Sequence, residues 1–574
     1  MNEPSTSDIR WNRQDYKAVI ILATVSGVLL LGGLGIRTLW GAEDRWANVT
    51  REMMQSKNYF LPTINGRVYF DKPLLSYWAI IPFAKIAGDV TETAARLPGA
   101  IAALLTTILT FIIGRRLFDR KTGFIAGLLF STSVMTIYWL RCASADALNL
   151  LFIWFAFWTF IAGAKEGRLS YTIAFYCICA AGSFFKGLVV PAVVLAVVGF
   201  YSVIELLIEM RKRGLSGGAF KEALSLRLRW LISVSGAVGI LCGIAVFVLL
   251  FLMPMLATGS WESAQLMWRE NVQRFFEPFD HKEPFYVYFE HSMIFAAPWS
   301  LLFIVALVSA RKWEKNESKW LILLIAAGIF IFFTASGSRR SYYIMPLIPA
   351  MAIIIARALR DWFAHKEGAK WLGVAFGVTV AAFLVIGILL LVAFFTPESL
   401  IRSVKNRELI LDIIKKTPFH LPVSIAIIGG AVASILLLIK NRTRVAFALI
   451  VMVAMIGEIW LFTAVVSAGE RGRTLARFCI TAREILKDVP GEQIALYRTY
   501  RSHTGSVIYY LKRSGLDELS KEADLKAFLE KHPQCYIITE DINVGAIQSL
   551  HAERLLTQKK DTEERANVLL RISR

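Results

Sequence analysis

Charged residues that could do chemistry gather in a polar segment directly after the first long apolar run, which extends from Ala18 to Leu39. The segment opens with adjacent carboxylates, Glu43 and Asp44, which run straight into Arg45. A carboxylate beside apolar spans can have a shifted pKa and can orient or deprotonate an acceptor hydroxyl. Acidic side chains are costly near hydrocarbon, so their position predicts chemistry at a membrane surface. A helix-end acid pair that compensates the dipole is the structural alternative.

A second block, Tyr69-Phe70-Asp71-Lys72-Pro73, lies in the same polar segment. A lysine on a proline-rigidified turn can place its ammonium against a lipid phosphate, and the aromatic neighbours suit the headgroup zone. The block therefore favours phosphate binding by Lys72. A lysine that only snorkels to the interface is the alternative.

Two further groups of charges lie at the ends of apolar runs. Arg141 and Asp146 bracket the junction of the runs 122–140 and 146–164, where Asp146 could pair with a cation and the two could equally form a structural ion pair. Lys186 ends a later run. A lone lysine at membrane depth is expensive unless it is paired, which predicts a function or a salt bridge to an acid.

Two basic-aromatic motifs complete the candidates. Arg274 precedes Phe275, and the segment 336–343 contains Arg340, Tyr342 and Tyr343. An arginine fork can bind a phosphate in a bidentate manner, and a tyrosine hydroxyl can add a hydrogen bond. Tyrosine pairs also occur as ordinary residues of the interfacial belt. No compact metal-ligand set accompanies these motifs, so no metal site is predicted, although a divalent metal is left open.

The composition indicates a polytopic helical membrane protein. Of 574 residues 56% are hydrophobic, the mean hydropathy is +0.53, and apolar runs of about 20 residues recur. Thirteen spans are predicted, at 18–39, 93–114, 122–140, 146–164, 170–184, 187–208, 231–256, 286–310, 320–335, 341–356, 371–395, 421–439 and 445–465. The first reads as a retained anchor, because no cleavage site precedes it.

The net charge of +20 comes largely from alternate loops rich in lysine and arginine. Such loops face the cytoplasm, which places the N-terminus inside and the C-terminus outside. The charge is therefore assigned to topology, and no nucleic acid partner is predicted. The same orientation puts all the polar clusters described above on the outer face, where they could line one cavity.

The chain changes character near residue 467. Segments 494–498, 535–539 and 564–573 read as strands, and 505–513 and 517–531 carry helical periodicity. We expect a transmembrane domain over 1–466, with an outer loop at 40–92, and a small soluble α/β domain over 467–574 that acts as a stabilising cap or as an acceptor-side wall without chemistry. Whether Cys479 and Cys535 of this domain pair is left open.

The ordered blocks of the first loop resemble the first external loop of the GT-C membrane glycosyltransferases. The blocks are Glu43-Asp44-Arg45-Trp46-Ala47, Arg51-Glu52-Met53 and 69–73. Within that group the chain is most similar to the aminoarabinose-lipid A transferases and the bacterial protein O-mannosyltransferase-like enzymes. Lys186-Gly187 and the segment 339–346 resemble later motifs, so the resemblance covers roughly the first two thirds of the chain. It departs from the family where the acid pair meets Arg45 without a spacer.

The resemblance implies a GT-C fold of about 13 transmembrane helices in a bacterial inner membrane, with the active site facing the periplasm. It further implies inverting transfer of a sugar, such as 4-amino-4-deoxy-L-arabinose, from undecaprenyl phosphate to a lipid A phosphate, without a cofactor. The implied catalytic positions are Glu43, Asp44 and Asp146. The implied donor-phosphate positions are Tyr69, Lys72, Arg274, Arg340, Tyr342 and Tyr343, and the other cavity positions are Arg45, Asp71, Arg141 and Lys186.

Several alternatives stay open. A protein hydroxyl could replace lipid A as acceptor, as in a protein O-mannosyltransferase, and the motifs do not decide the sugar. A lipid or small-molecule transporter would show paired half-repeats and broken helices at midplane, which the sequence does not indicate. Within the acid pair, Glu43 is preferred as the base because it is the first of the two acids in the sequence. Glu43→Gln is thus expected to reduce activity and Asp44→Asn to affect stability.

The predicted orientation can be tested with a reporter that is active only in the cytoplasm. Fused after Arg574, it is expected to give no signal, because the alternating basic loops place the C-terminus outside. The same reporter fused after a basic loop such as 115–121 is the positive control. A strong signal from the C-terminal fusion would overturn the loop assignment.

Overall fold

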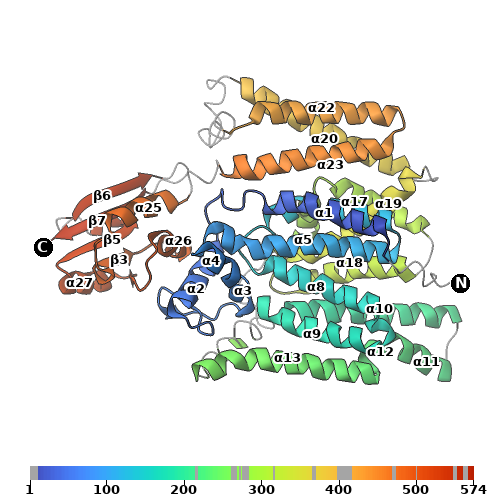
Figure 1. Ribbon diagram of the computed structural model, residues 1–574, viewed down its shortest axis with the longest axis horizontal. Helices are drawn as coiled ribbons and strands as arrows, with labels where there is room; N and C mark the ends of the chain where they lie inside the picture. The colour runs from blue at the N-terminus through green and yellow to red at the C-terminus, as the bar shows by residue number, and fades with distance from the viewer. Residues whose placement is uncertain are drawn as a thin grey trace.

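The computed structural model describes residues 11–213, 217–259, 261, 265, 268–269, 273, 283–313, 317–364, 370–396, 417–467, 474–499, 501–546, 552–559 and 566–573. Long helices stand side by side in one bundle, and a mixed sheet flanked by short helices lies at one end of it (Figure 1). Helices α2, α3 and α4 lie between the bundle and the sheet. The predicted fold class, a polytopic helical protein with a small C-terminal α/β domain, is confirmed.

The bundle is built from apolar helices that follow the predicted spans. They are α1 (Arg13–Leu31), α5 (Glu92–Leu117), α6 (Arg120–Ser131), α7 (Val134–Tyr138), α8 (Asp146–Ala162), α9 (Leu169–Lys186), α10 (Val189–Arg213), α13 (Val234–Thr258), α16 (Val287–Ala296), α17 (Ser300–Ser309), α18 (Glu317–Ala335), the 3-10 turn η5 (Ser341–Leu347) with α19 (Ile348–Phe363), α20 (Lys370–Phe395), α22 (His420–Ile439) and α23 (Thr443–Trp460). Short helices α11 (Gly218–Arg227) and α12 (Arg229–Ile232) join α10 to α13.

All thirteen predicted spans fall on helices of this bundle. Within the described ranges, nine helices are long and apolar enough to cross a membrane, and α16 with α17, bent by 107°, could form a tenth. Helices α8 and α18 are apolar but shorter. The predicted span 122–140 is broken into α6 and α7 at Thr132 and Ser133, where Ser133 adopts an extended conformation.

The first helix lies closer to the N-terminus than predicted. Helix α1 covers 13–31 instead of 18–39, because Asn12 caps its start. The Asn12 side chain accepts hydrogen bonds from the backbone N–H groups of Gln14 and Asp15, and the Asp15 carboxylate accepts one from the Asn12 N–H. Its first turn is polar, so hydropathy alone starts the span too late. Asp15 also binds Arg115 at 2.8 Å, which ties the start of α1 to the end of α5.

Helices α5 and α6 approach closely at two glycines. A Cβ atom at Gly123 would lie 2.4 Å from the carbonyl oxygen of Phe111, and one at Gly114 would lie 2.9 Å from the Cα of Gly123. Small residues let helix backbones pack closely in membranes, where association depends on van der Waals contact. The pair forms part of the core that carries the site residues of α8.

The first outer loop folds into a compact unit. It contains α2 (Glu43–Ser56), the hairpin of β1 (Thr63–Ile64) and β2 (Arg67–Val68), α3 (Leu75–Trp78) and α4 (Ile81–Ala87). The hairpin turns at Asn65-Gly66, both with positive φ, as a tight two-residue turn requires. Glu52 of α2 holds the turn, because it accepts from the Asn65 N–H and the Thr63 hydroxyl, each at 2.7 Å.

The C-terminal region forms a five-stranded sheet of order β4-β3-β5-β7-β6. Strands β3 (Ile494–Tyr497), β4 (Asp517–Leu519) and β5 (Gln534–Glu540) are parallel, while β6 (Ala552–Lys559) and β7 (Ala566–Ser573) are antiparallel. Helices α25 (Ala476–Ile485), α26 (Arg501–Leu511) and α27 (Glu522–Lys531) cover it.

Two secondary-structure predictions in this region are wrong. Residues 517–519 form strand β4 rather than the start of a helix, because they pair with β3, and strand β6 was not predicted. The predicted boundary at 466/467 lies beside 468–473, which is outside the described residues. No disulfide joins Cys479 and Cys535, which are both described and belong to separate apolar clusters.

Polar contacts join the C-terminal domain to the first outer loop. Asn48 donates to the carbonyl of Gly505 at 2.7 Å, and Arg51 donates to the carbonyl of Tyr509 at 2.9 Å while its guanidinium lies 4.3 Å from the Tyr509 ring centroid. Asn65 both donates to and accepts from the backbone of Leu516. The hairpin and α2 therefore hold the domain over the end of the bundle.

Candidate active site

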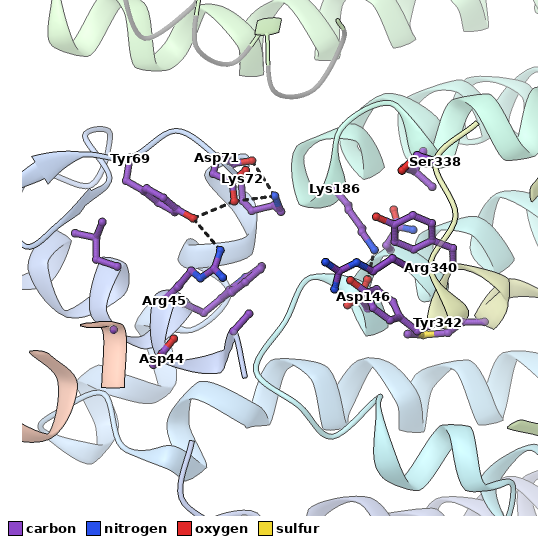
Figure 2. A pocket seen from close by; sticks show the side chains of 18 of the residues that line it. Asp44, Arg45, Tyr69, Asp71, Lys72, Asp146, Lys186, Ser338, Arg340 and Tyr342 are labelled. Carbon is purple, nitrogen blue, oxygen red and sulfur yellow. Dashed lines mark hydrogen bonds and ion pairs between the residues drawn. The ribbon is translucent and has the colours of Figure 1, made fainter. Parts of the chain in front are cut away.

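One cavity of about 1340 Å³ lies where the first outer loop, the bundle and the C-terminal domain meet. It is lined by parts of the chain that are far apart in sequence (Figure 2). Its polar and charged lining residues are Asp44, Arg45, Asn65, Tyr69, Asp71, Lys72, Asp146, Asn149, Lys186, Ser336, Ser338, Arg340, Tyr342, Tyr343, Arg498, Thr499, Thr504, Glu518 and Ser520. The cavity thus gathers predicted residues from the loop 40–92, from Asp146, from Lys186 and from the segment 336–343, together with residues of the C-terminal domain.

Glu43 does not line this cavity. Its carboxylate receives two hydrogen bonds from Arg96 of α5, at 2.7 and 2.8 Å, and one from the backbone N–H of Ala143 at 2.7 Å. Arg37 adds an ion pair at 3.4 Å. Burial alone would raise the pKa of Glu43, but the charges and hydrogen bonds of Arg96 and Arg37 outweigh it and lower that pKa. Glu43 is therefore a fixed anion inside the protein.

Asp44, its neighbour on α2, faces the cavity instead. The side chain is 2% exposed and accepts a hydrogen bond from the Ser506 hydroxyl of α26 at 2.8 Å. A Cβ atom at Gly505 would lie 2.7 Å from the Asp44 carboxyl carbon, so the domain approaches Asp44 closely through a glycine. Burial raises the pKa of Asp44 to about 6, against the opposing effects of Ser506 and Arg45. Such a group can exchange a proton near neutral pH.

The Tyr69 to Lys72 block forms a hydrogen-bonded chain on one side of the cavity (Figure 2). Arg45 donates to the Tyr69 hydroxyl at 3.5 Å, and Tyr69 donates to Asp71 at 3.0 Å. Lys72 pairs with Asp71 at 3.0 Å. Burial and the charge of Asp71 raise the pKa of Tyr69 to about 12, so the phenol stays protonated and remains a donor.

Asp146 and Lys186 form an ion pair on the other side of the cavity, where Figure 2 also shows Arg340 and Tyr342. The Lys186 ammonium lies 4.6 Å from the ring centroid of Tyr343 and 5.1 Å from that of Tyr342. Cation–π contacts and a carboxylate stabilise an ammonium in surroundings that would otherwise exclude it. The expectation that Lys186 pairs with an acid is met by Asp146.

Arg340 differs from the other cations beside the bundle. Its backbone precedes η5, and its guanidinium lines the cavity without a hydrogen bond or ion pair to any residue in the described ranges. By contrast, its neighbour Arg339 donates to the carbonyls of Thr334 and Glu283. Arg340 therefore presents a guanidinium with unoccupied N–H donors, an open fork, to the cavity.

Of the two other predicted residues, one is placed elsewhere in the bundle and one is not among the residues that the structure describes. Arg141 donates to the carbonyl of Gly32 and is absent from the cavity wall, so it neither lines the site nor pairs with Asp146. Arg274 lies outside the described residues. Among the described side chains, no group of three or more His, Cys, Asp or Glu is placed to hold a metal ion.

The sequence analysis allowed the C-terminal domain to form an acceptor-side wall but named none of its residues as part of the site. Arg498 and Thr499 follow strand β3, and Ser520 follows β4. A signal was present, because the predicted strand at 494–498 ends in the polar run Arg498 to Arg501, and side chains after a parallel strand commonly form sites. Docking over the bundle could not be read from that signal.

Comparisons with known proteins support the fold and the predicted resemblance. Residues 71–219 match the family model described as dolichyl-phosphate-mannose-protein mannosyltransferase. A protein of Shewanella sediminis named undecaprenyl phosphate-alpha-4-amino-4-deoxy-L-arabinose arabinosyl transferase is 25% identical over 376 residues, which cover 64% of each chain. A protein of the same name from Aeromonas hydrophila is 27% identical over 60% of this chain and 61% of its own. The match thus spans just under two thirds of these relatives' length.

Solved structures extend the likeness to nearly the whole chain. The crystal structure of ArnT from Cupriavidus metallidurans bound to undecaprenyl phosphate has a TM-score of 0.69 at 18% identity, covering 96% of this chain and 97% of that one. The oligosaccharyltransferase AglB from Archaeoglobus fulgidus has a TM-score of 0.50 at 12% identity, covering 93% and 70%. The chain has the GT-C fold, as predicted, and the transporter alternative gains no support.

The environment of Glu43 predicts that Glu43→Gln lowers stability first. The neutral amide leaves the Arg96 guanidinium, which is 2% exposed, without its counter-charge, and breaking a buried pair destabilises by about 3–5 kcal/mol. The expected result is a lower midpoint of thermal unfolding for the purified full chain in detergent. Glu492→Gln, on an exposed residue, is the control. An unchanged midpoint combined with lost turnover would return the base role to Glu43.

Proposed function

We propose that the chain is an inverting membrane glycosyltransferase that moves 4-amino-4-deoxy-L-arabinose from undecaprenyl phosphate to a phosphate of lipid A. The site would face the periplasm from the inner membrane. The observation that carries the proposal is the cavity itself, in which a titratable carboxylate, Asp44, and an open cation, Arg340, line the same space at the end of an apolar bundle. The names of the relatives supply the sugar and the lipid carrier.

The donor phosphate would bind on the bundle side of the cavity. Arg340 has free guanidinium nitrogens for a bidentate phosphate contact, and the hydroxyls of Tyr342 and Tyr343 line the same wall. Phe332, Phe333 and Val189 give that wall apolar surface suited to the polyprenyl chain. The leaving group is an ionised phosphodiester that needs no general acid, so cations placed against it lower the barrier as charge develops.

The ion pair of Asp146 and Lys186 would hold the sugar rather than the phosphate. Its charges are mutually neutralised, while the remaining lone pairs and N–H donors can bond sugar hydroxyls or an amine. Lys72 is similarly engaged by Asp71, which reduces the net charge that it offers to a phosphate. We therefore assign the main phosphate contact to Arg340 and a supporting one to Lys72 and Tyr69.

Asp44 would act on the acceptor side. With a pKa of about 6 it is mostly ionised at pH 7 and can take a proton from an attacking group. A lipid A phosphate is already ionised, and in that case Asp44 would orient the acceptor or bind the amino group of the sugar. Glu43, the leading acid, is assigned to structure instead.

A protein O-mannosyltransferase is the second candidate. It is favoured by the match of residues 71–219 to the mannosyltransferase family model. A serine or threonine hydroxyl is a weak nucleophile, so this reaction would require the base. The raised pKa of Asp44 is compatible with either acceptor.

The two functions are separated by a transfer assay with the purified full chain. Undecaprenyl-phosphate aminoarabinose with lipid A is expected to give lipid A of increased mass, detected by mass spectrometry. Polyprenyl-phosphate mannose with serine- and threonine-containing peptides is the parallel reaction. Glycopeptide without modified lipid A would replace the first proposal by the second, and product from neither pair would reject both.

Removal of the cavity carboxylate tests the role of Asp44. Asp44→Asn should reduce turnover by about 100-fold or more, because general-base or positioning groups contribute at this scale, while the amide can still accept from Ser506. For the wild type, turnover should fall as the pH is lowered through about 6, where Asp44 becomes protonated and the required anion is lost. The measurement is initial rate against pH for both proteins.

The control is Asp488→Asn, on an exposed residue outside the cavity, which should keep wild-type turnover. If Asp44→Asn lost activity but the initial rate of the wild type did not fall near pH 6, Asp44 would position the acceptor rather than take its proton. Full activity of Asp44→Asn would remove Asp44 from the mechanism.

A further inference from the structure

The carboxyl ends of two parallel strands of the C-terminal domain open into the cavity. Arg498 and Thr499 follow β3, and Ser520 follows β4, and all three line it. In open α/β sheets, ligands bind beyond the carboxyl ends of the strands. The domain, which was expected to be a cap or an acceptor-side wall without chemistry, therefore turns toward the cavity the edge at which open α/β sheets commonly bind ligands.

Arg498 is held in place by its backbone and by one end of its side chain. Its φ of 47° is in the left-handed region, which is unfavourable for a residue with a Cβ atom and occurs where surrounding contacts impose it. The Arg498 N–H donates to the carbonyl of Leu519 at 2.9 Å, and its Nε donates to the carbonyl of Ser520 at 3.2 Å. Asn543 donates to its carbonyl at 3.5 Å.

The terminal nitrogens at the other end of the Arg498 side chain are open, and the guanidinium carbon lies 5.2 Å from the ring centroid of Tyr497. The two terminal nitrogens make no hydrogen bond or ion pair with the part of the chain that the structure describes, and the residue is exposed on the cavity wall. A guanidinium fixed at Nε and free at both terminal nitrogens presents the paired donors that suit a phosphate. Glu518 lines the same wall with opposite charge, but it accepts from Asn65 at 2.8 Å.

The cavity thus has two cations with open forks among its described residues, one on each wall. Lys72 is paired with Asp71 and Lys186 with Asp146. Arg45 donates to Tyr69 and has the negative charges of Asp44 and Asp71 close by. This leaves Arg340 on the bundle side and Arg498 on the domain side. A transfer from one phosphate to another brings two anions into one cavity, and the two guanidinium groups match that requirement in number, with one on each wall.

We propose that Arg498, with the hydroxyls of Thr499 and Ser520, forms the subsite that holds the phosphate of a glycolipid acceptor. This subsite rests on the proposed function and adds the place where the acceptor is recognised. A lipid is favoured over a peptide because the cavity joins this polar edge to further apolar residues, Trp46, Ile64 and Ile508, as an amphiphile requires.

Steady-state kinetics of the full chain tests the subsite. Arg498→Gln keeps much of the side-chain length and removes the charge, and it should raise the apparent KM for lipid A by about tenfold or more, as expected when a charged hydrogen-bonding partner is lost. The kcat and the KM for the lipid-linked donor should stay close to wild type, because Arg340 is unchanged. Arg498→Lys should recover part of the loss, since it restores the charge without the fork.

Arg554→Gln is the matched control. It makes the same chemical change on an exposed residue of β6 that does not line the cavity, so it should leave every parameter unchanged. An unchanged acceptor KM in Arg498→Gln, or an equal rise in Arg554→Gln, would overturn the subsite. A rise in the KM for a peptide acceptor instead of lipid A would also overturn it in favour of a peptide site.

A binding measurement separates this inference from the proposed function. Wild-type protein in detergent should bind lipid A more tightly than dephosphorylated lipid A, and Arg498→Gln should lose that difference. Loss of the difference in a chain that transfers no sugar would support the subsite while rejecting the transferase. Equal binding of both lipids by the wild type would reject the glycolipid subsite. Binding of inorganic phosphate with no binding of either lipid would also reject it.

Discussion

The buried ion pair between Glu43 and Arg96 is the interaction on which the rest of the site depends. Arg96 projects from α5 and uses its remaining donors on the carbonyls of Leu34, Arg37 and Thr38, each at 2.7 Å. One guanidinium thereby fixes the connection after α1, the start of α2 and the bundle together. Glu43 also accepts from Ala143, which adds the segment before α8. Isolated charges would be costly here, and full hydrogen bonding offsets that desolvation.

This arrangement explains why two adjacent acids have different environments. Successive residues of a helix point about 100° apart, so if Glu43 turns into the protein, Asp44 turns elsewhere. The pKa values then separate: Arg96 and Arg37 lower the pKa of Glu43, whereas burial raises the pKa of Asp44 to about 6. Pairs of titratable groups pushed apart in this way commonly have different roles.

Much of the architecture could be predicted from the sequence, because apolar runs and basic loops report directly on membrane helices. The pairing of Lys186 with an acid could also be expected, since a lone ammonium is unstable at that depth. Which of Glu43 and Asp44 faces the cavity could not be predicted from the sequence. The deciding partner, Arg96, lies on another helix and reaches Glu43 only through tertiary contacts. Strand β6 was missed for a similar reason: its polar residues give no clear alternation, and pairing with β7 imposes the strand.

The contact between Asp44 and α26 joins the two ends of the chain. Ser506 bonds Asp44 across 462 positions, Asn48 bonds Gly505 across 457 and Asn65 bonds Leu516 across 451. During synthesis, the helices of the bundle emerge well before these partners exist. The carboxylate therefore stays open to water until the last part of the chain has been made and folded. The cavity is thus completed late in biogenesis. A chain that stops after the bundle would insert into the membrane without the C-terminal wall of its cavity.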